Sequence, residues 1–399
     1  MRWIVGGVTA ARGFAACGIS AGIKRGRKPD LALVVSTAPA TAAAVFTRNR
    51  VQAAPVLLSS SRVRRGSARA VLINSGCANC LTGRAGLEDA RRITGRVAQQ
   101  LGIPADEVLV ASTGLIGRRL PVPRVLGAIP RLVAHVSRAN HAAAAQAILT
   151  TDLRIKEAAV QAPIGGRLCR LGGMAKGAGM LAPSLATMLC VITTDAQIAP
   201  GLLRALLREA VGGTFNRVSI DGDMSTNDTV FALASGRSGA VIRRGRPSER
   251  IFRGMLYAVA ERLSRLLVKD GEGVARVMDI EVVGARTDQE AQACARQIGN
   301  SPLVKTMLAG GDPNVGRIAA AVGASPARCN PEALDIRIGP VRLVSRGAIL
   351  PASPSAVRRL LSRPEVAIRV DLHAGRGRGR VIGCDLTEEY VRINAGYAT

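Results

Sequence analysis

Short apolar runs, each bounded by turn residues or charges, limit the fold of this chain more than any other feature. Aromatic residues make up only 2% of the chain, so the core has to be built from Ala, Val, Leu and Ile. Runs of this kind predict short strands. The expected strands are 31–36, 42–47, 55–60, 69–74, 107–112, 188–194, 215–220 and 277–284.

Segments with apolar residues at helical spacing alternate with these runs. Leu87, Ala90, Ile93 and Val97 recur three or four residues apart, and Gly102 supplies a C-terminal stop. The expected helices are 87–102, 121–149 with a break near Pro130, 200–213, 247–270 and 288–299. Because no linker rich in Pro, Ser or Gly divides the 399 residues, we expect one large α+β unit with a smaller C-terminal lobe.

The formal net charge of +27 raises the question of a nucleic-acid partner. Only six of the 55 basic residues are lysine, and the arginines are spread along the whole chain. No recognition motif or set of stacking aromatics accompanies them, so we expect no specific nucleic-acid partner. No apolar run has the length of a membrane span, and we expect a cytoplasmic protein with no membrane partner.

The cysteines and histidines exclude several kinds of catalyst. Cys77 and Cys80 have C-x-x-C spacing, which leaves a redox or metal role open beside the alternative of buried structural thiols. The only histidines are His135, His141 and His373, none next to a Ser or Cys motif, so a Ser-His-Asp or Cys-His catalyst has little support. We expect no metal site and no bound cofactor.

One nucleophile needs no histidine: an N-terminal threonine, whose own α-amine acts as its base. The segment "AKGAGMLAPSLATMLCVITTDA" (175–196) places Ala186-Thr187 between a loop of small residues and an apolar strand. If the hydroxyl of Thr187 attacks the carbonyl of Ala186, the chain cuts itself and frees that amine. From spacing alone, Ala-Thr at a strand start is also an ordinary sequence.

The motifs of the chain resemble those of the ornithine acetyltransferase family, also called glutamate N-acetyltransferase or ArgJ. The resemblance includes "KGAGMLAPSLATMLCVITTDA" and extends from end to end. The other matching motifs are "VTAARGFAACGISAGIK" (8–24), "AAAVFTRNRVQAAPV" (42–56), "INSGCANCLTG" (73–83), "ASTGLIG" (111–117), "TFNRVSIDGDMSTNDT" (214–229), "KDGEGVAR" (269–276), "SPLVKTMLAGGDPNVGRI" (301–318) and "NAGYAT" (394–399).

The resemblance implies an α+β fold, a layered helix/sheet/sheet/helix sandwich of the ArgJ/DmpA-like type that cuts itself into two chains. The cut between Ala186 and Thr187 would give an α chain of 1–186, which holds the oxyanion-hole residues, and a β chain of 187–399, which includes the C-terminal lobe. Two α and two β chains would form an α2β2 heterotetramer.

The implied reaction belongs to arginine biosynthesis. Thr187 takes the acetyl group from N2-acetylornithine and passes it to glutamate by a ping-pong exchange through an acetyl-threonine ester. Acetyl-CoA is a possible second donor, which would make the enzyme bifunctional as an amino-acid N-acetyltransferase. Thr113 and Gly114 match the oxyanion-hole pair, and a hydroxyl and a backbone N–H are both suitable donors.

Other family positions contact the substrate. Lys176 would pair with a substrate carboxylate and Glu272 with the charged amine, while Asn394 and Thr399 close the site from the C-terminal end. By residue type alone, these four are typical of surface charges and a frayed tail. The family pattern "TTDT" is "TTDL" here, so Leu153 replaces a Thr and removes a hydroxyl that could form a hydrogen bond.

Two alternatives remain for the function. An N-terminal-threonine amidohydrolase or aminopeptidase of related fold would let water reach the acyl-enzyme, whereas a transferase has to exclude it. A decayed, non-catalytic basic protein would stay uncut and bind polyanions with a steep salt dependence. Lys176 and Glu272, which suit a small zwitterion, favour the transferase.

Overall fold

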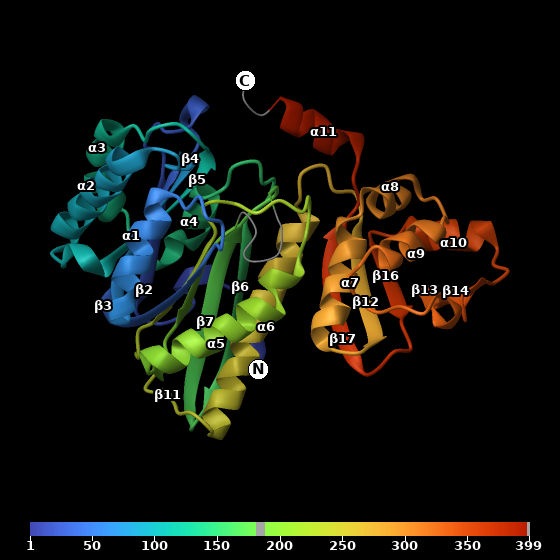
Figure 1. Cartoon of the computed structure of the whole chain (residues 1–399). Coiled ribbons are helices and arrows are strands. Elements are labelled where there is room, and N and C mark those ends of the chain that lie inside the picture. The colour runs from blue at the N-terminus through green and yellow to red at the C-terminus, as the bar shows by residue number, and fades with distance from the viewer. Residues whose placement is uncertain (181–187, 397–399) are drawn as a thin grey trace. The chain divides into compact units, whose positions relative to one another are not determined.

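The computed structural model describes residues 1–180 and 188–396, and these form two compact units (Figure 1). The first unit contains residues 1–177, 188–216 and 224–267 and carries a sheet of nine described strands. The second contains residues 178–180, 217–223 and 268–396 and carries a sheet of six. Helices and sheets are mixed in both units, which confirms the α+β class.

The large sheet of the first unit joins segments that are far apart in the sequence. Its order is β1-β6-β7-β8-β10-β3-β4-β5, with β2 paired to β3; β8 runs parallel to β10 and β4 parallel to β5. The strands are β1 (Arg2–Ile4), β2 (Phe14–Ile19), β3 (Leu31–Phe46), β4 (Ser67–Cys77), β5 (Val108–Leu115), β6 (Lys156–Ile164), β7 (Arg167–Lys176), β8 (Leu189–Thr194) and β10 (Thr229–Ala234). β9 (Gln197–Ile198) and β11 (Val241–Ile242) form a separate short pair.

Strand β3 belongs to both halves of this sheet. It pairs with β10 on one side and with β4 on the other, and its register with β4 shifts between Val35 and Ala40. One core cluster contains apolar side chains from β7, β8 and β10 together with side chains from β3, β4 and β5. Its members include Val34, Ile73, Leu109, Met174, Val191 and Phe231. The two halves therefore pack face to face.

Helices cover the outer faces of the two halves. Alternate residues of β3, Leu31 and Leu33, turn away from the inter-sheet core and pack with α2 and α3. On the other side, α6 brings Leu263 against Gly173 of β7, and Figure 1 shows α5 and α6 beside β6 and β7. This layering confirms the expected helix/sheet/sheet/helix order. The helices are α1 (Ala54–Arg62), α2 (Gly83–Leu101), α3 (Val122–Ala134), α4 (His141–Ala147), α5 (Pro200–Gly213) and α6 (Pro247–Lys269).

Two of the expected strands are wrong. Residues 55–60 lie in helix α1, where Pro55 occupies the first turn and one face is buried. A short apolar run has no periodicity that separates a strand from a buried helix, and Pro near the N-terminus favours the helix. Residues 215–220 form a 3-10 turn (Phe215–Arg217) and then a single bridge between Val218 and Ile382.

Two other expectations had the wrong boundaries. Segments 31–36 and 42–47 belong to one continuous strand, β3, which ends at Phe46. Its first part pairs with β4 and its last part with β10. The helix expected over 121–149 continues through Pro130, ends at Ala134 and resumes as α4 at His141. Helix α2 ends at Leu101 and Gly102 adopts the left-handed conformation, as its position predicts.

The second unit has its own sheet and core. The sheet order is β15-β14-β13-β16-β12-β17, and the described core residues run from Met278 to Val381. Its strands are β12 (Val277–Ala285), β13 (Asp335–Ile338), β14 (Val341–Ser345), β15 (Ala348–Ile349), β16 (Glu365–Asp371) and β17 (Gly377–Cys384). Its helices are α7 (Asp288–Asn300), α8 (Pro302–Gly310), α9 (Gly316–Gly323), α10 (Pro354–Leu361) and α11 (Glu388–Ala395).

Phe231 offers a test of the inter-sheet core. Its side chain is 1% exposed, and its ring meets Phe46 edge to face with centroids 6.1 Å apart. We expect Phe231→Ala to lower the free energy of unfolding by about 3–5 kcal/mol, because it leaves a cavity between the sheets. Urea unfolding followed by circular dichroism measures the change. The exposed Leu57→Ala is the control, and equal losses in the two variants would contradict the assigned core.

Candidate active site

A buried lysine ends strand β7. The side chain of Lys176 is 2% exposed, and its Nζ donates to Thr150 Oγ1 at 2.6 Å and to Thr113 Oγ1 at 3.4 Å. Lys176 is also the register partner of Leu189, the first residue of β8. Sheet pairing therefore places its ammonium group next to the start of β8, two residues after the expected nucleophile.

The carboxylate of Asp152 balances this charge. It lies 3.4 Å from Lys176 Nζ and 2.7 Å from Lys156 Nζ, and it accepts the backbone N–H of Gly177 at 2.7 Å. Burial by itself would raise the pKa of Asp152, but the ammonium groups of Lys176 and Lys156 and these hydrogen bonds outweigh it and hold the pKa below its usual range. Asp152 is thus ionised, and both lysines have a buried counter-charge.

Thr113 and Gly114 stand near the end of β5, beside β4. Thr113 is 4% exposed and accepts a hydrogen bond from Lys176, so its own hydroxyl hydrogen is available for another acceptor. Gly114 has a φ of 126°, and a Cβ there would lie 2.4 Å from the carbonyl carbon of Gly76. Only glycine allows this approach of two strands. A hydroxyl and a backbone amide, the donor types of an oxyanion hole, are therefore adjacent in the sequence here.

The chain just after the expected cleavage position is held firmly. Met188 donates its backbone N–H to Asp228 Oδ1 at 3.0 Å, and its carbonyl accepts from Thr229 at 3.1 Å. Complete burial raises the pKa of Asp228 well above its usual range, against the opposing effect of the Met188 N–H. The neighbouring Asn227 donates to the carbonyls of Ala78 and Ser112 at 2.7 and 2.8 Å. These contacts tie β8, β10 and β5 together at one end of the sheet.

Two more of the predicted residues meet within the second unit. Asn394 Nδ2 donates to Glu272 Oε2 at 2.9 Å. The backbone N–H of Glu272 donates to the carbonyl of Ala178 at 2.7 Å. The Oε2 atom of Glu272 lies only 2.5 Å from the position that a Cβ on Gly179 would occupy. The carboxylate of Glu272 therefore packs against the backbone of the glycine-rich loop.

Of the four remaining predicted residues, three lie outside the described residues and Leu153 lies at the surface. Ala186, Thr187 and Thr399 lie outside the described residues, so their roles stay predictions. Leu153 is 84% exposed, whereas Thr150, three residues earlier, contacts Lys176. The sequence reasoning missed Thr150, Asp152 and Asp228. The clustering of polar residues in "TTDL" and "STND", each beside an apolar strand, was the available signal.

The described residues leave the redox and metal alternatives without further support. Cys77 and Cys80 are both buried and free of disulfides, and burial raises the pKa of the Cys77 thiol, which disfavours the reactive thiolate. Within residues 1–180 and 188–396, no group of three or more His, Cys, Asp or Glu side chains could hold a metal ion. In the same ranges, no helix combines the length and the apolar character needed to cross a membrane.

Known proteins resemble this chain along its whole length. The sequence pattern of the ArgJ family matches residues 15–399. A protein named arginine biosynthesis bifunctional protein ArgJ from a Synechococcus species is 46% identical over 99% of this chain and 98% of its own length. The chloroplastic protein of that name from Sorghum bicolor is 44% identical over 100% of this chain and 88% of its own. A crystal structure of that bifunctional protein from Bacillus halodurans matches with a TM-score of 0.50 and 42% identity, over 51% of this chain and 97% of the solved chain.

This layered α+β fold buries a lysine against a threonine hydroxyl next to a glycine at positive φ, a set of donor groups that suits an acyl-transfer enzyme. The chain belongs to the ArgJ family. It is therefore an acetyltransferase of arginine biosynthesis.

Asp152→Asn tests the buried charge network. At pH 7 we expect the free energy of unfolding to fall by about 3–5 kcal/mol, because two buried ammonium groups lose their counter-charge. The folded-state pKa of Asp152 lies below the unfolded value of about 3.9, so its stabilisation is complete above that pH and is lost as the pH falls through the folded pKa. The difference between variant and wild type should therefore shrink in acid.

Urea unfolding at several pH values between neutral and acid measures this difference. The exposed Asp312→Asn removes a carboxylate of the same size and is the matched control. A difference for Asp152→Asn that stays constant down to the most acidic pH would mean that Asp152 is not held ionised by the two lysines.

Proposed function

We propose that the chain cuts itself between Ala186 and Thr187 and then transfers the acetyl group of N2-acetylornithine to glutamate through an ester of Thr187. The observation that carries the proposal is the convergence of Lys176 and Thr113 beside the start of β8. Met188, the next residue after Thr187 in the sequence, donates its backbone N–H to Asp228. The proposal assigns the nucleophile, the oxyanion donors and the lysine to one site.

Self-cleavage would begin with attack of the Thr187 hydroxyl on the carbonyl carbon of Ala186. The Ala186-Thr187 amide becomes an ester, the nitrogen of Thr187 takes up the hydroxyl proton, and water then hydrolyses the ester. The solved Bacillus halodurans chain, almost fully covered by about half of this chain, has the length that a two-chain form predicts. We infer that the mature protein is an α chain of 1–186 and a β chain of 187–399, assembled as α2β2.

Acetyl transfer would use the freed amine as the base. It accepts the Thr187 proton as the oxygen attacks the acetyl carbonyl, and it returns a proton to the departing ornithine amine. The Thr113 hydroxyl and the Gly114 N–H would donate to the oxyanion, and the hydrogen bond from Lys176 leaves the Thr113 hydrogen free for this task. Glutamate then attacks the ester and takes the acetyl group. Acetyl-CoA, the second donor that the resemblance allows, would acylate the same hydroxyl and release free CoA.

The substrate would be held by the groups already paired in the structure. Lys176 can exchange its long contact to Thr113 for a substrate carboxylate, because Thr150 and Asp152 still hold the ammonium group in place. Glu272, whose carboxylate accepts a hydrogen bond from Asn394 within the second unit, stays in this proposal as the contact to the second amine of ornithine that the resemblance alone predicts. Thr399 stays in this proposal as a contact predicted by the resemblance alone.

The intact mass of the purified, denatured protein tests self-cleavage. We expect two fragments in equal amounts, the second beginning "TMLCVITTDA". Thr187→Ala should stay whole at 41.5 kDa, because it has no hydroxyl to attack the preceding carbonyl. Cleavage of Thr187→Ala at the same bond would show that an outside protease makes the cut and would overturn the proposed nucleophile.

Thr113→Val tests the oxyanion donor without changing the side-chain shape. We expect self-cleavage and acetyl transfer both to slow by about 100-fold or more, because a donor to the oxyanion is lost. Timed mass spectra and transfer from N2-acetylornithine to labelled glutamate measure the two rates. Thr306→Val removes a threonine hydroxyl from the exposed face of α8 and is the matched control. Equal rates in the two variants would exclude Thr113 from the reaction.

A further inference from the structure

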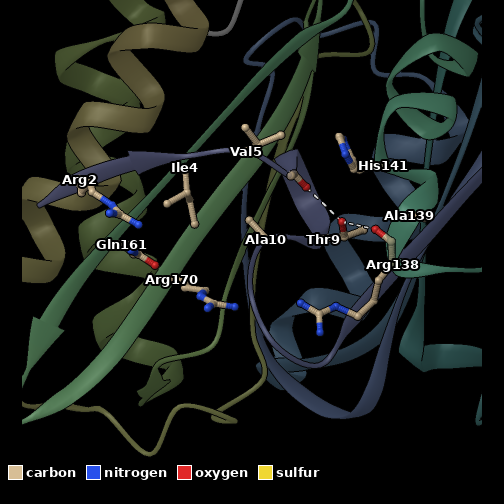
Figure 2. A pocket seen from close by; sticks show the side chains of 11 residues that line it. Arg2, Ile4, Val5, Thr9, Ala10, Arg138, Ala139, His141, Gln161 and Arg170 are labelled. Atoms are coloured by element: carbon tan, nitrogen blue, oxygen red, sulfur yellow. Dashed lines mark hydrogen bonds between the residues drawn. The ribbon is translucent and has the colours of Figure 1, made fainter.

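An arginine-lined pocket of about 610 Å³ opens beside the N-terminal strand of the first unit. Arg2 of β1, Arg170 of β7 and Arg138 of the 3-10 turn Arg138–Asn140 line it. Figure 2 shows the side chains of Arg138 and Arg170 extending toward one another. Gln161 and His141 add polar groups, and the volume falls in the range of small-molecule sites.

The strand register produces this concentration of positive charge. Arg2 is the register partner of Gln161, and Gln161 is the partner of Arg170. Directly paired residues lie on the same face of a sheet, so Arg2, Gln161 and Arg170 form a row across three strands. Two strand spacings separate the arginines by about 9–10 Å. A ligand bearing more than one negative charge can reach both.

The opposite wall of the pocket is held in place from the N-terminal segment. The Thr9 hydroxyl, drawn with dashed lines in Figure 2, donates to the carbonyl of Arg138 at 2.7 Å and lies 3.1 Å from that of Gly6. These contacts connect the chain after β1 to the turn that carries Arg138. The position of the third arginine is therefore set by the fold rather than by a free surface loop.

Within the described residues, no carboxylate pairs with the arginine side chains of the pocket; the nearby Asp195 is bonded to the backbone N–H of Arg170 and to the side chain of Arg12. None of the eleven residues that line it is acidic, and within the described residues none of the three arginines forms an ion pair. The Nε atom of Arg170 is buried without a hydrogen-bond partner in the same part of the chain. The carboxylate of Glu157 is already hydrogen-bonded to Nδ1 of His141 at 2.9 Å. An anion bound between the arginines would reduce the repulsion between their charges.

We propose that this pocket binds a phosphate-bearing small molecule of nucleotide size. Guanidinium groups bind phosphate oxygens in bidentate geometry. Three arginines line this pocket, and Gln161 lies between Arg2 and Arg170 in the sheet. The site is separate from the proposed catalytic one: Arg170 and Lys176 are six residues apart on β7, about 20 Å. Between them, Gly172 packs so tightly on Gly7 that an added Cβ would lie 2.0 Å from the Gly7 oxygen.

Isothermal titration calorimetry on the purified full chain, in the cleavage state in which it is isolated, tests the proposal. The probes are pyrophosphate, ATP, coenzyme A and, as a carboxylate anion, glutamate, each at about 150 mM salt. We expect one saturable site per chain for a phosphate probe. Arg170→Gln and Arg138→Gln should each weaken it by about tenfold or more, because each removes charged hydrogen bonds. Comparable binding of all phosphate probes would identify phosphate as the recognised group, and binding of coenzyme A alone would identify its larger nucleotide.

Arg167→Gln is the matched control, since Arg167 begins the same strand, is exposed and lies outside the pocket. It removes the same charge and should leave binding unchanged. Equal weakening in all three variants would show nonspecific attraction to a basic protein and overturn the site. Absence of saturable binding, or saturable binding of glutamate but of no phosphate probe, would overturn it too. Thermal melting of Arg170→Gln beside the wild-type chain shows whether its loss of binding reflects unfolding.

Discussion

The buried carboxylate of Asp152 is the interaction on which the candidate site depends. It lies between the ammonium groups of Lys156 and Lys176, which are 1% and 2% exposed. An ammonium group buried without a partner would cost several kcal/mol and would tend to lose its proton. Asp152 gives Lys176 a carboxylate partner 3.4 Å away while the lysine contacts Thr113. The burial of Lys156 and Lys176 therefore depends on the carboxylate of Asp152.

A core of small aliphatic residues allows the close packing that this network requires. With aromatics at 2%, the two halves of the large sheet meet mainly through Ala, Val, Leu and Ile. Glycines allow close approaches of the backbone, at Gly114 against Gly76 and at Gly172 against Gly7. A larger side chain at Gly114 would push β5 away from β4 and move Thr113. The geometry near the oxyanion donors thus follows from packing as much as from hydrogen bonding.

Sequence reasoning succeeded where the signal was local and failed where it was not. The amphipathic pattern and Gly102 predicted helix α2 correctly, because periodicity and a C-terminal glycine are properties of neighbouring residues. The run 55–60 is a helix and 31–46 is one strand, since short apolar runs carry no periodicity that distinguishes the two. Thr113, Gly114 and Lys176 were named from motifs, and the structure brings Thr113 and Lys176 into contact. Thr150 and Asp152 were not named, because nothing in "TTDL" indicates which of its side chains turns inward.

The sequence by itself determined the class of fold, the family and the identity of the candidate nucleophile, because these depend on composition, periodicity and long motifs in order. Only the tertiary structure decided which polar groups meet. Lys176 reaches Thr113 across 63 residues, and Arg2 joins Arg170 through Gln161. The physical reason is the strand order, in which β1 pairs with β6 and β8 lies between β7 and β10. Neighbours in such a sheet are set by the burial of whole faces, which no local stretch of sequence contains.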